Sequence, residues 1–171
     1  MTKAIGFLTA MFLACSILVP APVQAQWILN GTAIGAQTGN QYSPQMISDG
    51  FGGSIVVWEE WRSGDRNIYA QRIDAHGRAQ WSAGGATVCA LPGLQQEPRI
   101  APDGAGGAIV MFIDRSTPAN ELYLQRMTGS TGATAWGAGV RICTVPDSLL
   151  SADMAGDGSG GLVGARVVAV G

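Results

Sequence analysis

Two kinds of side chain recur along this sequence in types that could bind a ligand. Arginine follows glutamine at Arg72 and again at Arg126, and its guanidinium is suited to carboxylates and sugars. Tryptophan occurs at Trp81 and Trp136, where indole rings could stack on a sugar or fill a core. Because both sets recur at nearly the same interval, a structural role is favoured: the arginines would pair with an acid such as Glu60 or Asp114, and the tryptophans would pack between units. Binding sites in repeat proteins are instead expected where the repeat is broken.

Catalytic chemistry has little support in the sequence. Glu59 and Glu60, with Asp65 nearby, could suggest a glycosidase pair, but neighbours in a strand point to opposite faces. The next unit has Ile113 at the position equivalent to Glu59, so the pair is not repeated. His76 is the single histidine, it lies in a predicted turn, and there is no nucleophile motif beside it. We therefore predict no catalytic residue.

Metal and disulfide sites are not expected either. Each of the turns that begin at Asp49, Asp103 and Asp157 offers one carboxylate, whereas calcium takes six to eight oxygens, so each aspartate is predicted to cap its own turn. Cys89 and Cys143 occupy equivalent positions in neighbouring units, which should hold their Cα atoms further apart than the ~7 Å that a disulfide allows. Two buried thiols, no metal and no cofactor are the prediction.

The elements that would carry these residues follow a regular period of about 54 residues. The turn Asp-Gly-x-Gly-Gly begins at 49, 103 and 157, and a β-branched run follows it. Within one unit we expect four short strands, over residues 44–48, 54–59, 67–74 and 80–89. No stretch after Ala25 has a sustained helical period.

Four strands in each unit of about 50 residues resemble the blades of β-propellers found in secreted bacterial proteins. The resemblance rests on Asp-Gly-x-Gly-Gly-x-Ile-Val-x-Trp, then Ile-Tyr-x-Gln-Arg, then a later tryptophan, and it covers Trp27 to about Val163. The chain departs from the pattern at Arg166, where an aromatic is expected. The resemblance implies a scaffold that hosts binding, lectin-like or hydrolytic functions, without choosing among them.

The expected architecture is therefore all-β, built from four-stranded antiparallel β-propeller-type blades. Two full blades would span 44–97 and 98–151, with partial blades at 26–43 and 152–171. Rings typically need four to eight blades, so one chain would not close a ring. Other copies of the chain or further blades of a longer chain are the expected partners, and the off-pattern end at Gly171 indicates a truncated propeller. An open stack with exposed edges is the third outcome.

The N-terminus predicts export. Lys3 precedes an apolar stretch over 4–19, and Val23-Gln24-Ala25 fits a signal-peptidase site, so cleavage is expected after Ala25. An uncleaved anchor is the alternative, but prolines break the apolar run before the length that a membrane span needs. The mature region, 26–171, is then periplasmic or extracellular and leaves the membrane.

Composition limits the function further. Charged residues make up 13% of the sequence and the formal net charge is -2, so a basic surface for nucleic acid is not expected. We predict an exported, non-enzymatic β-propeller-type binding or interaction module with a protein or carbohydrate ligand. The alternatives are an oligomeric lectin and a glycan-directed hydrolase of sialidase or glycosidase type, although the sialidase motif Ser-x-Asp-x-Gly-x-Thr-Trp is absent from the sequence.

Overall fold

The computed structural model describes residues 31–35, 39–62, 64–145, 149–157 and 159–169. Within these residues the chain is all-β: it contains strands and turns and no helix. In this part of the chain there is accordingly no helix long and apolar enough to cross a membrane. The predicted signal peptide, 1–25, lies outside the described residues.

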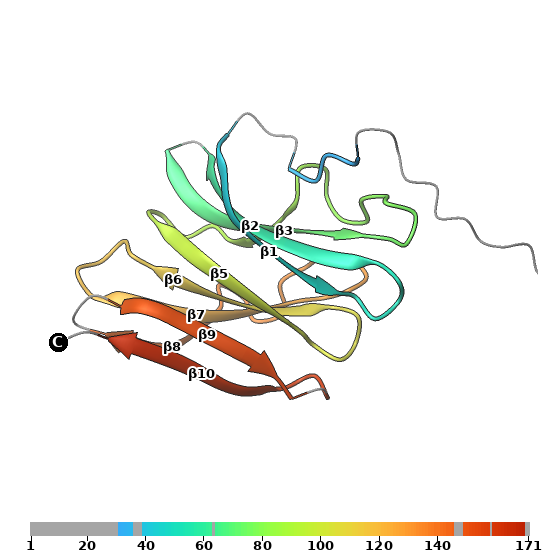
Figure 1. Cartoon of the computed structure of the whole chain (residues 1–171). Coiled ribbons are helices and arrows are strands. Elements are labelled where there is room, and N and C mark those ends of the chain that lie inside the picture. Colours follow the sequence, from blue (N-terminus) through green and yellow to red (C-terminus); the bar gives the residue numbers. More distant parts are fainter. Residues whose placement is uncertain (1–30, 36–38, 63, 146–148, 158, 170–171) are drawn as a thin grey trace, which may run out of the picture.

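In the described residues, ten strands form three antiparallel sheets, each of which follows the order of the chain. The first sheet contains β1 (Gln41–Ser48), β2 (Ser54–Arg62), β3 (Asp65–Ile73) and β4 (Ala86–Cys89). The second sheet contains β5 (Gln95–Pro102), β6 (Ala108–Asp114), β7 (Asn120–Met127) and β8 (Val140–Val145). The third pairs β9 (Leu149–Gly156) with β10 (Leu162–Ala169). The three sheets lie in layers, one above the next (Figure 1).

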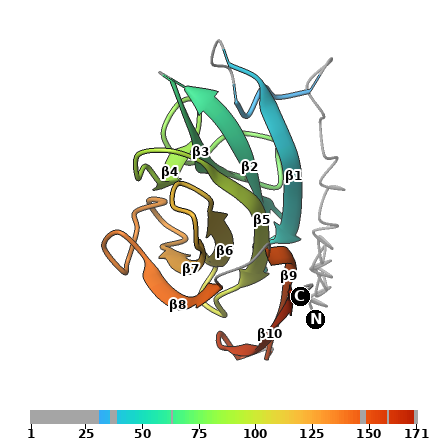
Figure 2. The ribbon, with the colours of Figure 1, turned by 90° about the vertical axis from the view of Figure 1, so that its left-hand side faces the viewer.

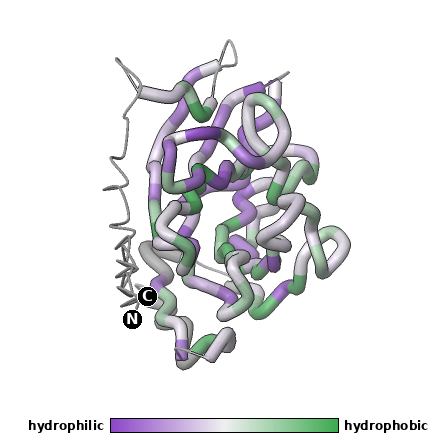
Figure 3. Tube along the Cα trace, turned by 90° about the vertical axis from the view of Figure 1, so that its right-hand side faces the viewer, coloured by the Kyte–Doolittle hydropathy of each residue, from purple (hydrophilic) through white to green (hydrophobic). Residues whose placement is uncertain are grey.

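The second strand of each four-stranded sheet is buried on both faces. β2 and β6 consist largely of β-branched and other large apolar residues, which suit a pleated surface covered on both sides. From Ile55 to Glu60, and along the whole of β6, every residue is buried. Elsewhere hydrophobic and hydrophilic residues are mixed along the chain (Figure 3). A strand with two buried faces needs cover on each side: β6 lies between two sheets, and β2 lies between the second sheet and the segment 31–35.

The main core lies between the first and second sheets. Ile55 and Val57 of β2 project from one face and meet Val110 and Phe112 of β6 in one buried cluster. Residues of opposite parity on β6 form a second cluster, which includes Met111 and reaches the third sheet through Met154. Because successive side chains of a strand point to opposite faces, β6 contributes to both interfaces. The second sheet is thus the middle layer of three.

The first strands of the three sheets lie near one another. β5 contacts β1 on one side and β9 on the other, whereas β4 and β8 lie on the opposite side of the molecule (Figure 2). The layers therefore fan out from the side that carries the first strands.

Strand boundaries differ from the expected ones most in the first and fourth strands; β2 also ends later and β3 begins earlier than expected, because the two strands stay paired up to the turn between them. The first strands begin at Gln41 and Gln95, before the prolines that were expected to open them, because a β-bulge accommodates each proline. Ser43 and Glu97, the residues before those prolines, have positive φ of 51° and 55°. The fourth strand, β4, covers 86–89 instead of 80–89, because residues 80–85 form a loop that ends in two positive-φ glycines.

Candidate functional site

The recurring acidic turns lie at one end of the sheets, which we call the turn end: the turns 49–53, 103–107 and 157–161. Asp49 Oδ1 accepts hydrogen bonds from the N–H groups of Phe51 and Gly53, both at 2.8 Å. Its Oδ2 receives the Arg72 guanidinium, with Nε at 2.9 Å and Nη2 at 2.8 Å. The prediction that the aspartate caps its own turn is confirmed here, whereas the suggested pairing of Arg72 with Glu60 is wrong.

The second turn repeats this arrangement. Asp103 Oδ1 accepts from the N–H groups of Ala105 and Gly107, and Oδ2 receives Arg126 Nε at 2.9 Å. Arg126 therefore pairs with Asp103 and not with Asp114. At the third turn Asp157 Oδ1 accepts from two backbone N–H groups in the same way.

Hydrogen bonding keeps the first two aspartates ionised. Burial alone would raise the pKa of Asp49, but the turn N–H groups and Arg72 outweigh burial and hold this pKa below its ordinary value. The pKa of Asp103 is lowered by the same balance, with Arg126 as the cation. Both carboxylates therefore serve the structure of the turns, because their oxygens bind turn N–H groups and an arginine.

The glutamines before each arginine fix the loop that leads to the fourth strand. Gln71 Oε1 accepts from the Trp81 backbone N–H at 2.8 Å, and Gln71 Nε2 donates to the Ser82 carbonyl at 2.9 Å. Gln125 makes the equivalent bond to the Trp136 N–H at 3.1 Å. Both amides are buried, so their polar groups need these partners.

Of the four candidate residues, Arg72 and Trp81 lie together. Trp81 Nε1 and Arg72 Nη1 each donate to the Gly129 carbonyl at 3.0 Å, which ties the first sheet to the second. Trp81 is 7% exposed, whereas Trp136 in the second sheet is 37% exposed. The contacts of Arg72, Trp81 and Arg126 hold sheets and turns, and none of the four candidates lines the hollows described below.

Charged and aromatic residues gather at the opposite end, beside the β2–β3 turn. We call this the polar end, and it comprises Tyr42, Glu59, Trp61, Arg66, Glu97 and Arg115. Glu59 is buried, its Oε1 accepts from the Glu97 N–H at 2.8 Å, and its Oε2 lies 2.6 Å from Arg66 Nη2. Arg115 pairs with the Glu97 side chain at 2.5 Å. Two ion pairs, one from each sheet, are thus joined through the Glu97 backbone.

Two exposed aromatic residues belong to the polar end. Trp61 is 46% exposed and Tyr42 is 41% exposed, and both line one hollow together with Gly39 and Asn40. The Arg66 guanidinium lies 4.5 Å from the centre of the Tyr42 ring, and Asn40 Nδ2 donates to the Tyr42 hydroxyl at 3.0 Å. An exposed, supported aromatic ring beside hydrogen-bonding groups is suited to ligand contact.

Sequence reasoning missed Tyr42 and Trp61 as candidates. Their equivalents one period later are Gln96 and Arg115, so the aromatic residues are specific to the first unit. The signal that indicates them is this departure from the period, which residues that recur do not reveal.

The two neighbouring glutamates of β2 have separate partners. Glu60 binds Arg62 at 2.7 Å and accepts from Trp58 Nε1 at 2.8 Å, whereas Glu59 faces the second sheet. Burial alone would raise the pKa of Glu60, but Arg62 and the Trp58 indole outweigh burial and lower it. The prediction that the two carboxylates point to opposite faces agrees with these contacts.

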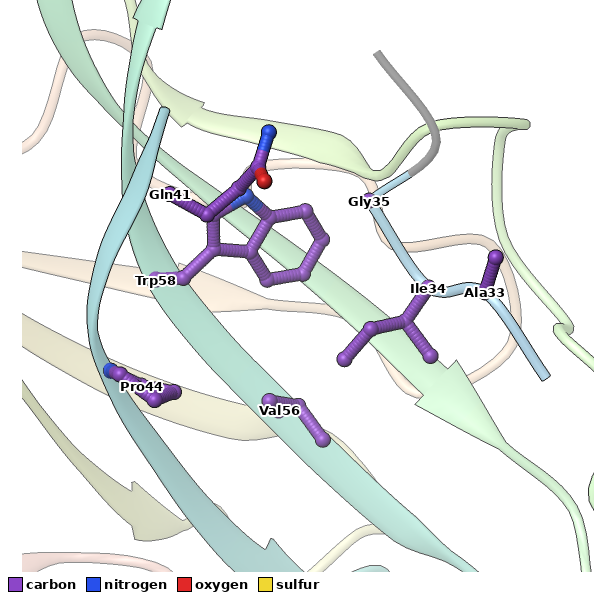
Figure 4. A pocket seen from close by; sticks show the side chains of 7 residues that line it. All are labelled: Ala33, Ile34, Gly35, Gln41, Pro44, Val56 and Trp58. Atoms are coloured by element: carbon purple, nitrogen blue, oxygen red, sulfur yellow. The ribbon is translucent and has the colours of Figure 1, made fainter. Parts of the chain in front are cut away.

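A second hollow, of about 250 Å³, lies on the outer face of the first sheet, away from the second sheet (Figure 4). Val56 and Trp58 form its floor, and Ile34 packs against them from the segment 31–35. The hollow is mostly apolar, and Gln41 is its one long polar side chain. An apolar sheet face of this kind is suited to a packed neighbour.

The described cysteines are free thiols. Cys89 is buried, and burial raises the pKa of its thiol to about 11. Cys143 is only half-buried, so the prediction of two buried thiols is wrong for this residue. Cys143 lies in β8, the last strand of the second sheet. In the described region the third sheet has only two strands, so no equivalent strand covers β8.

Comparisons of the chain with protein-family models, with curated proteins and with solved structures found no match.

Proposed function

We propose that this chain is an exported, non-enzymatic binding module of β-propeller type. The observation that carries the proposal is that successive sheets are arranged in the same way. Sheets one period apart are stacked one on the next, and the first strands of the three sheets, β1, β5 and β9, lie on the same side. Blades arranged around an axis have this relation. Export is proposed from the N-terminal sequence, with cleavage after Ala25.

The outer face of the first sheet supports stacking beyond the three layers. Ile34 packs on Trp58 there, and its equivalent one period later, Val88, packs in the cluster that contains Phe112. The segment 31–35 therefore packs against the first sheet in the same way as strand β4 packs against the second sheet. The hollow beside this segment leaves room for a further blade, which comes from another copy of the chain or from a longer chain.

A binding role is favoured because the polar end combines residues that vary between units with exposed aromatic rings. At the turn end, the aspartates and arginines are occupied by turns and by each other. At the polar end, the equivalents differ from one unit to the next and two aromatic rings face solvent. Repeat proteins commonly place ligand contacts on such variable positions.

The solution mass of the purified chain tests the assembly. We expect gel filtration with light scattering to give one discrete oligomer with a β-rich circular dichroism spectrum. Val56→Asp, on the outer face, should reduce the mass, whereas Val140→Asp, on an exposed strand, should not. A polydisperse aggregate, a disordered monomer, or a mass unaffected by Val56→Asp would count against the proposal. Turnover of chromogenic glycosides would contradict the non-enzymatic part.

A further inference from the structure

We infer that the polar end binds a neutral glycan, through the aromatic rings of Trp61 and Tyr42. The inference rests on the proposed binding function and adds the site and the ligand class. It follows from the exposure of the rings, the charge balance around them and the hydrogen-bonding groups at their border.

Exposure of the rings is the first step. Large aromatic residues are usually well buried, because they gain most from leaving water. Trp61 and Tyr42 instead remain 46% and 41% exposed and line the same hollow. They also lie on the same face of the first sheet, since Tyr42 is opposite Glu59 and Trp61 is opposite Arg66 in the ladder. Two rings thus form one open platform.

The platform is fixed before a ligand arrives. Arg66 lies against the Tyr42 ring and is itself held by the buried Glu59 carboxylate. The Trp61 N–H donates to the Asn40 carbonyl at 3.2 Å, and Asn40 Nδ2 bonds to the Tyr42 hydroxyl. A preorganised surface loses little conformational entropy on binding.

The charges around the platform favour an uncharged ligand. Glu59 is paired with Arg66, and Glu97 is paired with Arg115, so the four formal charges sum to zero. A phosphate or carboxylate ligand would be drawn by a surplus of positive charge, as would a sulfated or sialylated glycan. This end has no such surplus among its described ion pairs.

The hydrogen-bonding groups distinguish a glycan from a peptide. Arg66 and Arg115 contribute guanidinium donors, the partly exposed Glu97 side chain contributes a carboxylate acceptor, and Asn40 adds an amide that carries both. A sugar hydroxyl is both donor and acceptor, and the C–H face of a pyranose ring packs on an aromatic ring. A proline-rich peptide would also stack on the rings, but its backbone offers mostly acceptors. The mixed border therefore favours a polyhydroxylated ligand.

The test uses the full chain, expressed with its own N-terminal segment and purified, and probes it with neutral hexasaccharides. Cellohexaose, maltohexaose, laminarihexaose and chitohexaose are titrated while tryptophan fluorescence and heat are followed. We expect at least one to bind, and Trp61→Ala to weaken that binding about tenfold or more. Trp136→Ala is the matched control, because Trp136 is also a partly exposed tryptophan but lies outside the polar end. Tyr42→Phe should retain most of the affinity, and affinity should change little between low and high salt.

Each alternative outcome overturns the glycan inference. These outcomes are binding of anionic glycans only, binding of a polyproline peptide that Trp61→Ala abolishes, binding equally sensitive to Trp136→Ala, and no binding of any probe by a folded chain. Thermal unfolding of each variant shows whether the fold is intact. The solution mass distinguishes the two proposals: a discrete oligomer that binds no hexasaccharide leaves the propeller-type module standing and removes only its assigned ligand.

Discussion

The two ends of the first and second sheets are built from similar residue types but differ in how regularly they use them. At the turn end, Asp49 with Arg72 is reproduced one period later by Asp103 with Arg126, with the same atoms in contact. At the polar end, ion pairs are also present, but Glu59 is replaced by Ile113 in the next unit. Residues that recur with their contacts hold each layer to its turn. Residues that change give one unit a surface that its neighbour lacks.

The difference also appears in the solvent exposure of the carboxylates. Asp49 and Asp103 at the turn end are almost fully buried, as is Glu59 at the polar end, whereas the Glu97 side chain at the polar end is 32% exposed. A buried carboxylate that loses its partners leaves polar groups without water, whereas an exposed pair is screened by solvent. The turn-end aspartates should therefore contribute more to stability than Glu97 does, and the position of Glu97 should tolerate change.

The largest expected effect comes from Asp49→Ala. The substitution leaves two turn N–H groups and the Arg72 guanidinium without their acceptor, and we expect it to lower the free energy of unfolding by about 3 kcal/mol. Glu97→Gln, at the polar end, should lower it by about 0.5 kcal/mol or less. Urea unfolding followed by circular dichroism measures both. Equal losses of unfolding free energy for the two variants would contradict the expected difference between the two carboxylates.

Acid should destabilise the protein at several carboxylates, among them Glu60 and the aspartates of the turn end. The pKa values of Asp49 and Asp103 are lowered in the folded chain, because hydrogen bonds and arginines outweigh burial. A lowered folded pKa contributes stability that is present above the unfolded value of about 3.9 and is lost as pH falls through the folded value. Urea midpoints should thus be nearly constant from about pH 7 to 5 and fall below about pH 4.

Asp49→Asn is the control for this pH dependence. The amide oxygen can still cap the turn, but the position no longer titrates, so the fall in stability below about pH 4 should be shallower than in the parent chain. If the parent chain gained stability on acidification, the prediction that ionised Asp49 and Asp103 stabilise the fold would be contradicted.

A smaller effect is expected for the contact between layers. Trp81→Phe removes the indole donor to Gly129, while Arg72 still donates to that carbonyl, so the loss should be about 1 kcal/mol. Trp136→Phe, at the equivalent position of the second sheet, should change stability by a few tenths of a kcal/mol at most, because the side chain is partly exposed. The same urea experiment compares the two. If Trp136→Phe lowered the free energy of unfolding more than Trp81→Phe, the contact of Trp81 with Gly129 would not be the main contact between the layers.

Much of this layout could be predicted from the sequence, because the signals are local or periodic. The Asp-Gly-x-Gly-Gly turns and β-branched runs predicted the turns and second strands, and the capping role of Asp49 followed from the chemistry of its own turn. The partner of Arg72 could not be predicted in this way. Asp49 is 23 residues away and is brought close by the β1–β2 and β2–β3 ladders, which sequence spacing does not reveal.

The polar end was hidden for a related reason. Tyr42 and Trp61 come from different strands, and only the β1–β2 register places them at one hollow. The sequence also does not predict the bulge that sets this register, because a proline favours the beginning of a strand over its interior. Its positive-φ residues, Ser43 and Glu97, have no sequence signature such as glycine.

This bulge provides a small expected effect, and one of opposite sign. Ser43 has φ of 51°, a left-handed conformation that costs an L-residue about 1–2 kcal/mol and costs glycine almost nothing. Glycine also gives a more flexible unfolded chain, which offsets about 0.4–1 kcal/mol of that gain. Ser43→Gly should therefore raise the free energy of unfolding by about 0.5 kcal/mol, and Ser43→Ala should not raise it. If Ser43→Gly lowered stability instead, the serine side chain would be making a contact that outweighs its backbone strain. The bulge would then contribute to stability, as the turn-end aspartates do.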